Sequence, residues 1–123
     1  MGSEESPKYD LEERTFEFAE RVRAFVKRLP RTVSNYHDVG QLIRASGSVG
    51  ANYIEANESL GKKDFLMHIK ISRKEAKESR YWSRLVDVGN VNGLEEERGA
   101  IVQESTELMN IFGAILRKSG GSG

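Results

Sequence analysis

The chain of 123 residues is long enough for one compact core and too short for two ordinary domains. Its 19 Lys and Arg balance its 19 Asp and Glu, so no net charge draws the whole molecule onto nucleic acid or an acidic membrane surface. It has no cysteine, which excludes disulfides, a thiolate nucleophile and a sulfur metal site, and no apolar run approaches the ~20 residues that span a bilayer. We therefore predict a soluble, cytoplasmic protein without a membrane partner.

Apolar residues recur every three or four positions in four segments, which is the spacing of amphipathic helices. The first helix is expected over residues 11–29, and Pro30 is expected to end it. The second is expected to begin near Ser34, a residue type that caps helix N-termini, and to stop at Gly61, a residue type that ends helices.

The third helix is expected over residues 62–88. Residues 89–93 contain two glycines and two asparagines and predict a turn, after which the fourth helix spans 94–116. Helices of matched length joined by short loops predict an all-α fold, an antiparallel up-down-up-down four-helix bundle.

The two ends of the chain lack the helical pattern. Residues 1–7 are expected to be a disordered or vector-derived N-terminus and residues 118–123 a Gly/Ser tail or linker remnant, because both are small, polar and aperiodic. The single bundle domain is then residues 8–117. Such ends also fit an engineered component of an assembly.

The third predicted helix separates its charges. Residues 62–84 hold eight basic side chains within a sector of roughly 120° on a helical wheel, and three acidic ones on the other side. One interpretation is a phosphate-binding ridge for RNA or DNA, made of Lys63, Lys70, Arg73, Lys74, Lys77 and Arg84. The other is a solvated face, partly neutralised by the fourth helix, since residues 85–116 hold six acidic side chains and one basic.

Glu75 falls, with His68, on the side of the third helix that is expected to face inward. A buried carboxylate needs hydrogen-bond donors or a cation. One interpretation makes Glu75 a general acid, or a metal ligand shared with His68, in a metal-dependent enzyme. The other makes it a buried polar contact to the second helix, through Asn52, Tyr53 or Arg44.

Sequence motifs of bundle enzymes are missing. The chain has no Glu-x-x-His pair of the di-metal bundles, no His-Glu-x-x-His and no phosphate-binding glycine loop. We therefore predict no enzyme activity, no catalytic residue, no cofactor and no bound metal.

The second predicted helix carries small residues outside its apolar stripe. Such residues let a second surface approach closely, and two aromatic residues seven apart, Tyr9 and Phe16, lie off the main stripe of the first helix. These features predict a subunit interface made of Tyr9, Phe16, Gly47, Ser48, Ala51, Asn52 and Glu55. The alternative is a poor helix that tolerates its glycines at about 1 kcal/mol each.

Three stretches resemble the bacterial four-helix-bundle proteins called 23S rRNA intervening-sequence proteins: Gln41 to Ala56 (QLIRASGSVGANYIEA), Lys62 to Phe65 (KKDF) and Lys74 to Trp82 (KEAKESRYW). The resemblance covers residues 10–117 and implies an up-down-up-down bundle that assembles into a cyclic homopentamer, with no established enzyme activity. A related branch, the accessory proteins of diversity-generating retroelements, binds nucleic acid through a basic surface. This neutral chain departs from that branch, and it has Tyr-Ile-Glu-Ala where many relatives have Ile-Ala-Glu-Gly, so its second helix is expected to continue further.

Two functions follow as predictions. The first is a non-catalytic module that associates with itself into a cyclic homo-oligomer, a pentamer by the resemblance. The alternative is an RNA- or DNA-binding accessory protein that uses the basic face of the third helix.

Overall fold

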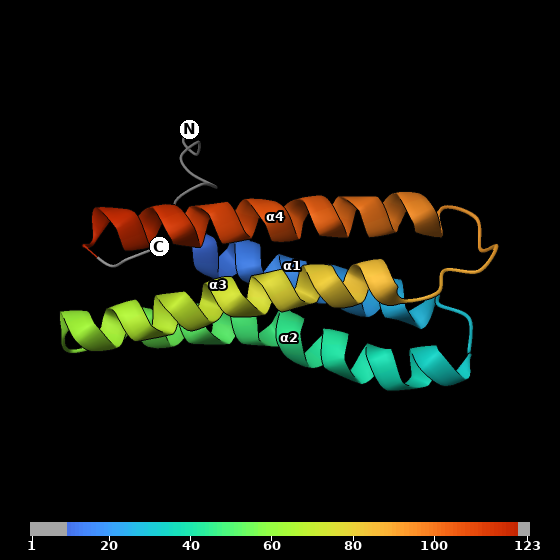
Figure 1. Cartoon of the computed structure of the whole chain (residues 1–123), viewed down its shortest axis with the longest axis horizontal. Helices are drawn as coiled ribbons and strands as arrows, with labels where there is room; N and C mark the ends of the chain where they lie inside the picture. The colour runs from blue at the N-terminus through green and yellow to red at the C-terminus, as the bar shows by residue number, and fades with distance from the viewer. Residues whose placement is uncertain (1–9, 121–123) are drawn as a thin grey trace.

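The computed structural model describes residues 10–120, which form four α-helices. Their bounds are Leu11–Lys27 (α1), Val33–Asn57 (α2), Lys62–Leu85 (α3) and Leu94–Lys118 (α4). Consecutive helices run in opposite directions along one long axis (Figure 1). The predicted all-α, antiparallel up-down-up-down bundle is therefore confirmed.

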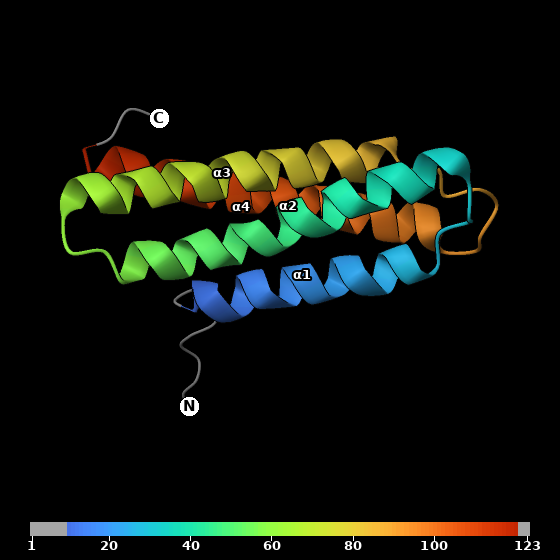
Figure 2. The ribbon, with the colours of Figure 1, turned by 90° about the horizontal axis from the view of Figure 1, so that it is seen from below.

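The four helices form a closed square. Each helix packs against the next one along the chain and α4 packs against α1, whereas the diagonal pairs do not touch at the level of their Cα atoms. The contact between α1 and α4 is the smallest of the four. Figure 2 shows α1 at one edge of the molecule, beside α2. Among residues 10–120, no helix is both long and apolar enough to cross a membrane.

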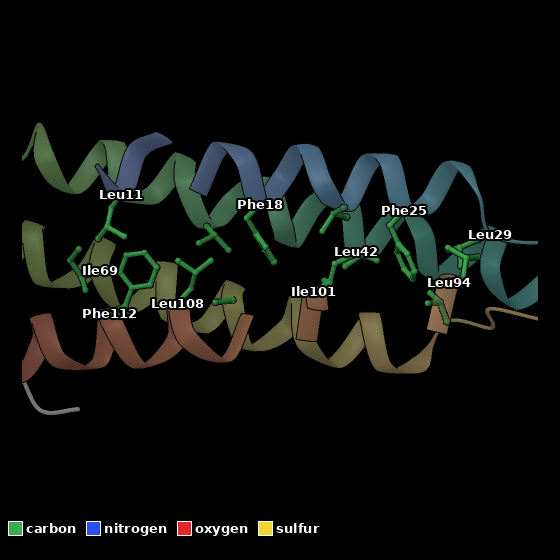
Figure 3. Close-up of a cluster of buried hydrophobic side chains, with 14 of the residues drawn as sticks. Leu11, Phe18, Phe25, Leu29, Leu42, Ile69, Leu94, Ile101, Leu108 and Phe112 are labelled. Carbon is green, nitrogen blue, oxygen red and sulfur yellow. The ribbon is translucent and has the colours of Figure 1, made fainter. Parts of the chain in front are cut away.

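Large apolar side chains fill the axis of the bundle from end to end (Figure 3). Every helix contributes side chains that are fully buried, among them Phe18, Phe25, Leu42, Ile69, Leu94, Ile101, Leu108 and Phe112. Each such side chain stabilises the fold by about 1.5–3 kcal/mol relative to leaving it in water. The stripe of three- and four-residue spacings in the sequence is therefore the core of the bundle.

Small residues let α1 and α2 approach closely in the middle of the bundle. A Cβ atom placed on Gly50 would lie 2.7 Å from the Thr15 Oγ1 atom. Thr15 is itself buried, and its hydroxyl donates to the Leu11 carbonyl at 2.7 Å. Only a glycine fits against α1 at this point.

Several predicted helix ends are wrong by a few residues. The second helix begins at Val33, and its N-cap is Thr32 rather than Ser34: the Thr32 hydroxyl accepts the Asn35 N–H at 3.0 Å. Gly61 does not end that helix. With an extended φ of −143°, Gly61 is instead the N-cap of α3.

Local hydrogen bonds explain the other ends. The second helix ends at Asn57, where the bonds tighten to a spacing of three residues: the Glu58 N–H also donates to the Glu55 carbonyl and the Ser59 N–H to the Ala56 carbonyl, both at 3.1 Å. These bonds satisfy the end of the helix without a left-handed glycine. The third helix ends at Leu85, where Arg98 of α4 donates from Nη1 to the Arg84 and Val86 carbonyls at 3.1 and 2.6 Å. The first ends at Lys27 and the fourth at Lys118, each two residues from its predicted end.

Candidate functional site

The six cations predicted to bind phosphates lie along the outer side of α3. We call them the α3 ridge: Lys63, Lys70, Arg73, Lys74, Lys77 and Arg84. Five of them are exposed and Arg73 is half-buried. At 1.5 Å rise per residue the ridge is about 32 Å long.

Three of the five acidic residues of α4 pair with α1, and none forms an ion pair with the ridge. The Arg14 guanidinium donates to Glu104 at 2.7 Å and to Glu107 at 2.8 Å, and the Arg21 guanidinium donates to Glu97 at 2.6 Å. The hydrogen bond to Glu104 is the largest cause that raises the pKa of Arg14 above its ordinary value. These ion pairs bridge the smallest helix contact of the bundle.

No ridge cation forms an ion pair with a carboxylate of residues 10–120. Glu78, on α3 itself, accepts from Arg44 of α2 at 3.0 Å. No ion pair with α4 therefore neutralises the ridge in this part of the chain, and a solvated face stays the alternative to a binding surface. The ridge keeps its positive charge available to an outside anion.

Part of the ridge borders a basic hollow between α3 and α4, with a volume of about 520 Å³. Its wall contains four ridge residues, Lys70, Arg73, Lys74 and Lys77, together with Met109, Asn110, Gly113 and Arg117 of α4. A Cβ atom on Gly113 would lie 3.4 Å from the Arg117 guanidinium. No acidic side chain lines the hollow, so it suits an anion.

Sequence reasoning missed Arg117, which adds a fifth cation to this hollow. The signal was available, because Arg117 lies one helical turn after Gly113 on the helix expected to be the antiparallel neighbour of α3. The carboxylates of α4 all lie before this turn, so the charge of the helix as a whole hides the cation near its end.

An apolar groove runs between α1 and α2, with a volume of about 480 Å³. It is lined by Thr15, Phe16, Ala19, Gly47, Gly50, Ala51 and Ile54, and its charged residues are Glu12, Glu20 and Arg23. Phe16 is 57% exposed and Ile54 is 45% exposed. Large apolar side chains are thus left in contact with water beside a floor of small residues.

Only some of the predicted interface residues lie in the apolar groove. Phe16, Gly47 and Ala51 meet in the apolar groove. Ser48, Asn52 and Glu55 do not line it, and Asn52 instead contacts α3, where its side-chain oxygen lies 3.1 Å from His68 Nδ1. Tyr9 lies outside the described residues.

Glu75 is buried, with 6% of its surface exposed. Its Oε2 atom accepts from Arg44 Nη1 at 3.4 Å, so one of the three suggested partners on α2 makes the contact. Its Oε1 atom is buried without a hydrogen-bond partner. The hydrogen bond to Glu75 is the largest cause that raises the pKa of the Arg44 guanidinium above its ordinary value.

His68 does not share a site with Glu75. Its ring contacts Asn52 and lies 3.8 Å from Asp64, through Nε2 and Oδ1. Residues 10–120 contain no group of three or more His, Asp or Glu side chains placed to hold a metal ion. The arrangement offers a polar contact between α2 and α3 that fixes their register.

The fold and its surfaces define an antiparallel helical bundle with one uncompensated basic face and one apolar groove. The family model of the 23S rRNA-intervening sequence protein matches residues 8–113, and the chain belongs to this family. A crystal structure of a protein with unknown function from the S23 ribosomal protein family of Bacteroides thetaiotaomicron VPI-5482 is similar. It is 28% identical, covers 85% of this chain and 96% of its own, and superposes with a TM-score of 0.72. No curated protein matches the chain.

Proposed function

We propose that this protein is a non-catalytic module that associates with copies of itself in a closed ring. The observation that carries this proposal is the apolar groove between α1 and α2, where Phe16 and Ile54 remain about half exposed. Burying such side chains in an interface is favourable by roughly 25 cal/mol per Å² of apolar surface. The family resemblance suggests five copies, and the absence of cysteine from the sequence fits the cytoplasm.

A ring requires that two different surfaces of the same chain meet, because a self-complementary patch closes at two copies. The groove supplies one such surface. Small residues at Gly47, Gly50 and Ala51 allow a neighbouring backbone to come close, and Glu12, Glu20 and Arg23 at its edge can fix the orientation of the neighbour.

The test is native mass spectrometry of the full chain and of two charge variants. Phe16→Glu places a carboxylate in the groove and is expected to shift the protein to monomer. Val33→Glu is the matched control, because Val33 is 92% exposed on α2 outside the groove and is expected to leave the assembly intact. A wild type that stays monomeric at every concentration contradicts the proposal, as does a Phe16→Glu variant with the wild-type mass.

We propose nucleic-acid binding as a second function, supported by the α3 ridge. Its cations form no ion pairs within the described residues, and Arg117 extends the charge onto α4. A cationic face of this kind displaces condensed counterions from a nucleic-acid backbone, so the affinity falls steeply with salt.

Binding of labelled RNA and DNA at several salt concentrations tests this function. The double variant Lys74→Glu, Lys77→Glu is expected to lose binding. The control is Lys27→Glu, Arg31→Glu, which changes the net charge equally at two exposed positions that do not belong to α3. If both variants weaken binding equally, the attraction is not located on the ridge; if the wild type binds no nucleic acid at low salt, this second function is excluded.

A further inference from the structure

An aromatic side chain lies near the C-terminal end of the α3 ridge, between its last two cations. Tyr81 follows Lys77 by four residues and precedes Arg84 by three, so the three side chains are neighbours on one helix face. Tyr81 is 55% exposed, and its hydroxyl forms no hydrogen bond with any residue of 10–120. The exposed part of the ring, between two cations, is accessible to a ligand.

The ring of Tyr81 is held by its neighbour. It packs edge-to-face against Trp82, with ring centroids 5.0 Å apart and an angle of 83° between the planes. Trp82 in turn packs against the core of the bundle. Because this contact restricts the tyrosine ring, the orientation of the ring is largely set before any ligand arrives.

A second apolar position lies near the start of the ridge. Leu66 and Met67 line a hollow of about 610 Å³ together with Lys63, Asp64 and Lys70, and Met67 is 47% exposed. Cations and apolar side chains therefore alternate at the two ends of the ridge, with Met67 between Lys63 and Lys70 and Tyr81 between Lys77 and Arg84. Between these ends, the cations Lys70, Arg73, Lys74 and Lys77 follow one another.

This alternation distinguishes two kinds of nucleic acid. A duplex presents its phosphates outward and keeps its bases stacked inside, so it would use the cations and leave Tyr81 and Met67 without contacts. A single strand presents phosphates and the faces of its bases together. Proteins that bind single strands combine a positive track with aromatic rings on which bases stack.

We infer that the α3 ridge binds single-stranded RNA or DNA, with one base stacked on Tyr81 and the adjacent phosphates on Lys77 and Arg84. This inference rests on the proposed nucleic-acid function and names its ligand class. The neutral total charge of the chain supports it, because a short local track with stacking contacts depends less on a global field than binding to a long duplex does.

The experiment compares a fluorescein-labelled single-stranded oligonucleotide with a duplex of the same length, by anisotropy at fixed salt. Tyr81→Ala is expected to weaken single-strand binding by a factor of roughly 5 to 100 and to change duplex binding less than about twofold. Tyr81→Phe keeps the ring and is expected to bind as the wild type does. Tyr36→Ala is the control, because Tyr36 is 91% exposed on α2.

Trp82 gives an independent signal. Trp82 is the only tryptophan of the chain and contacts Tyr81. A base stacked on Tyr81 is therefore expected to change the fluorescence of Trp82. The single strand should produce this change in the wild type and in Tyr81→Phe, and the duplex should not.

Each other outcome overturns the inference in a recognisable way. Equal affinity for single strand and duplex, with no effect of Tyr81→Ala, removes the stacking role and leaves nucleic-acid binding by the ridge intact. No binding of either oligonucleotide removes both. A Tyr81→Ala variant with unchanged binding and an altered native mass would show that Tyr81 belongs to a contact between protein chains.

Discussion

The side-chain amide of Asn35 pairs with the backbone of Asp87. The Asp87 N–H donates to Asn35 Oδ1 at 2.9 Å, and Asn35 Nδ2 donates to the Asp87 carbonyl at 2.8 Å. The same Nδ2 donates to the Pro30 carbonyl at 2.9 Å. Asn35 is 2% exposed, so one amide joins the loop before α2 to the loop before α4 at the same end of the bundle.

Replacing Asn35 by alanine is therefore expected to destabilise the fold by about 2–4 kcal/mol, because three backbone groups lose their partner at a buried position. The free energy of unfolding in urea measures the effect. Asn90→Ala, at an exposed position of the α3–α4 loop, is the matched control and should change the stability by less than about 0.5 kcal/mol. Equal stabilities of the two variants would contradict the role of Asn35.

A second prediction concerns two glycines of α2. Gly50→Ala is expected to cost about 1–3 kcal/mol, since its Cβ would lie 2.7 Å from Thr15 Oγ1 and α1 would have to move. Gly40→Ala is expected to stabilise the protein by about 0.5–1 kcal/mol, because a Cβ there meets nothing within 4 Å and alanine favours the helix. Thermal unfolding followed by circular dichroism separates the two, and changes of the same sign would refute the close approach of α1 and α2 at Gly50.

The contact between α1 and α4 is expected to weaken in acid. A hydrogen bond from Gln103, followed by one from Arg14, lowers the pKa of Glu107 below its ordinary value of 4.5. A carboxyl group whose pKa is lower in the folded state stabilises the fold above the unfolded-state pKa. That contribution is lost as the pH falls from about 4.5 through the lowered folded-state pKa.

Urea unfolding of Glu107→Gln between pH 7 and pH 3 tests this dependence. The variant is expected to lose less stability on acidification than the wild type does. Glu96→Gln serves as the control, because Glu96 is exposed on the same helix and makes no ion pair with any residue of 10–120. If the two variants follow identical pH profiles, Glu107 does not contribute in the manner described.

The buried carboxylate of Glu75 supports a fourth prediction. Arg44→Ala removes the cation beside Glu75 and is expected to lower the free energy of unfolding by about 1–2 kcal/mol. The loss is modest because Arg44 is half exposed and its contact with Glu75 is long, at 3.4 Å. Adding Glu75→Gln to that variant should recover part of the loss, because a neutral amide is less costly to bury than an unpaired charge. A double-mutant cycle measures the coupling, and strict additivity would show that the two residues do not interact.

The fold followed from the sequence because its signal is local. Three- and four-residue spacings of apolar residues mark each helix, and short loops leave little choice except antiparallel neighbours. The helix ends were less predictable because Thr32 and Ser34 both carry a hydroxyl, and only the backbone decides which one accepts the Asn35 N–H. The pairing of Asn35 with Asp87 joins residues 52 positions apart, and no local pattern indicates it.

The candidate sites were partly predictable for the same reason. A helical wheel places the ridge correctly because all its residues belong to one helix. The residues that line the groove depend on how α1 and α2 are rotated about their axes, which the sequence of one helix does not indicate. Phe16, Gly47 and Ala51 line the groove, whereas Asn52 contacts His68 of α3. The sequence also does not indicate which helix pairs with the carboxylates of α4, because both neighbours of α4, α1 and α3, contain arginines. Only the three-dimensional packing shows that the pairs form with α1.

The pairing of α4 with α1 has a consequence for the behaviour of the molecule as a charged particle. Its isoelectric point near 6.8 reflects only the total charge of the chain, whereas the cations of the α3 ridge lie together on one side of the molecule. We expect such a particle to drift slowly in an electric field near neutral pH and to adsorb on a negatively charged resin with α3 against the matrix. Its chromatographic retention therefore reports the placement of its charges and its electrophoretic mobility only their total.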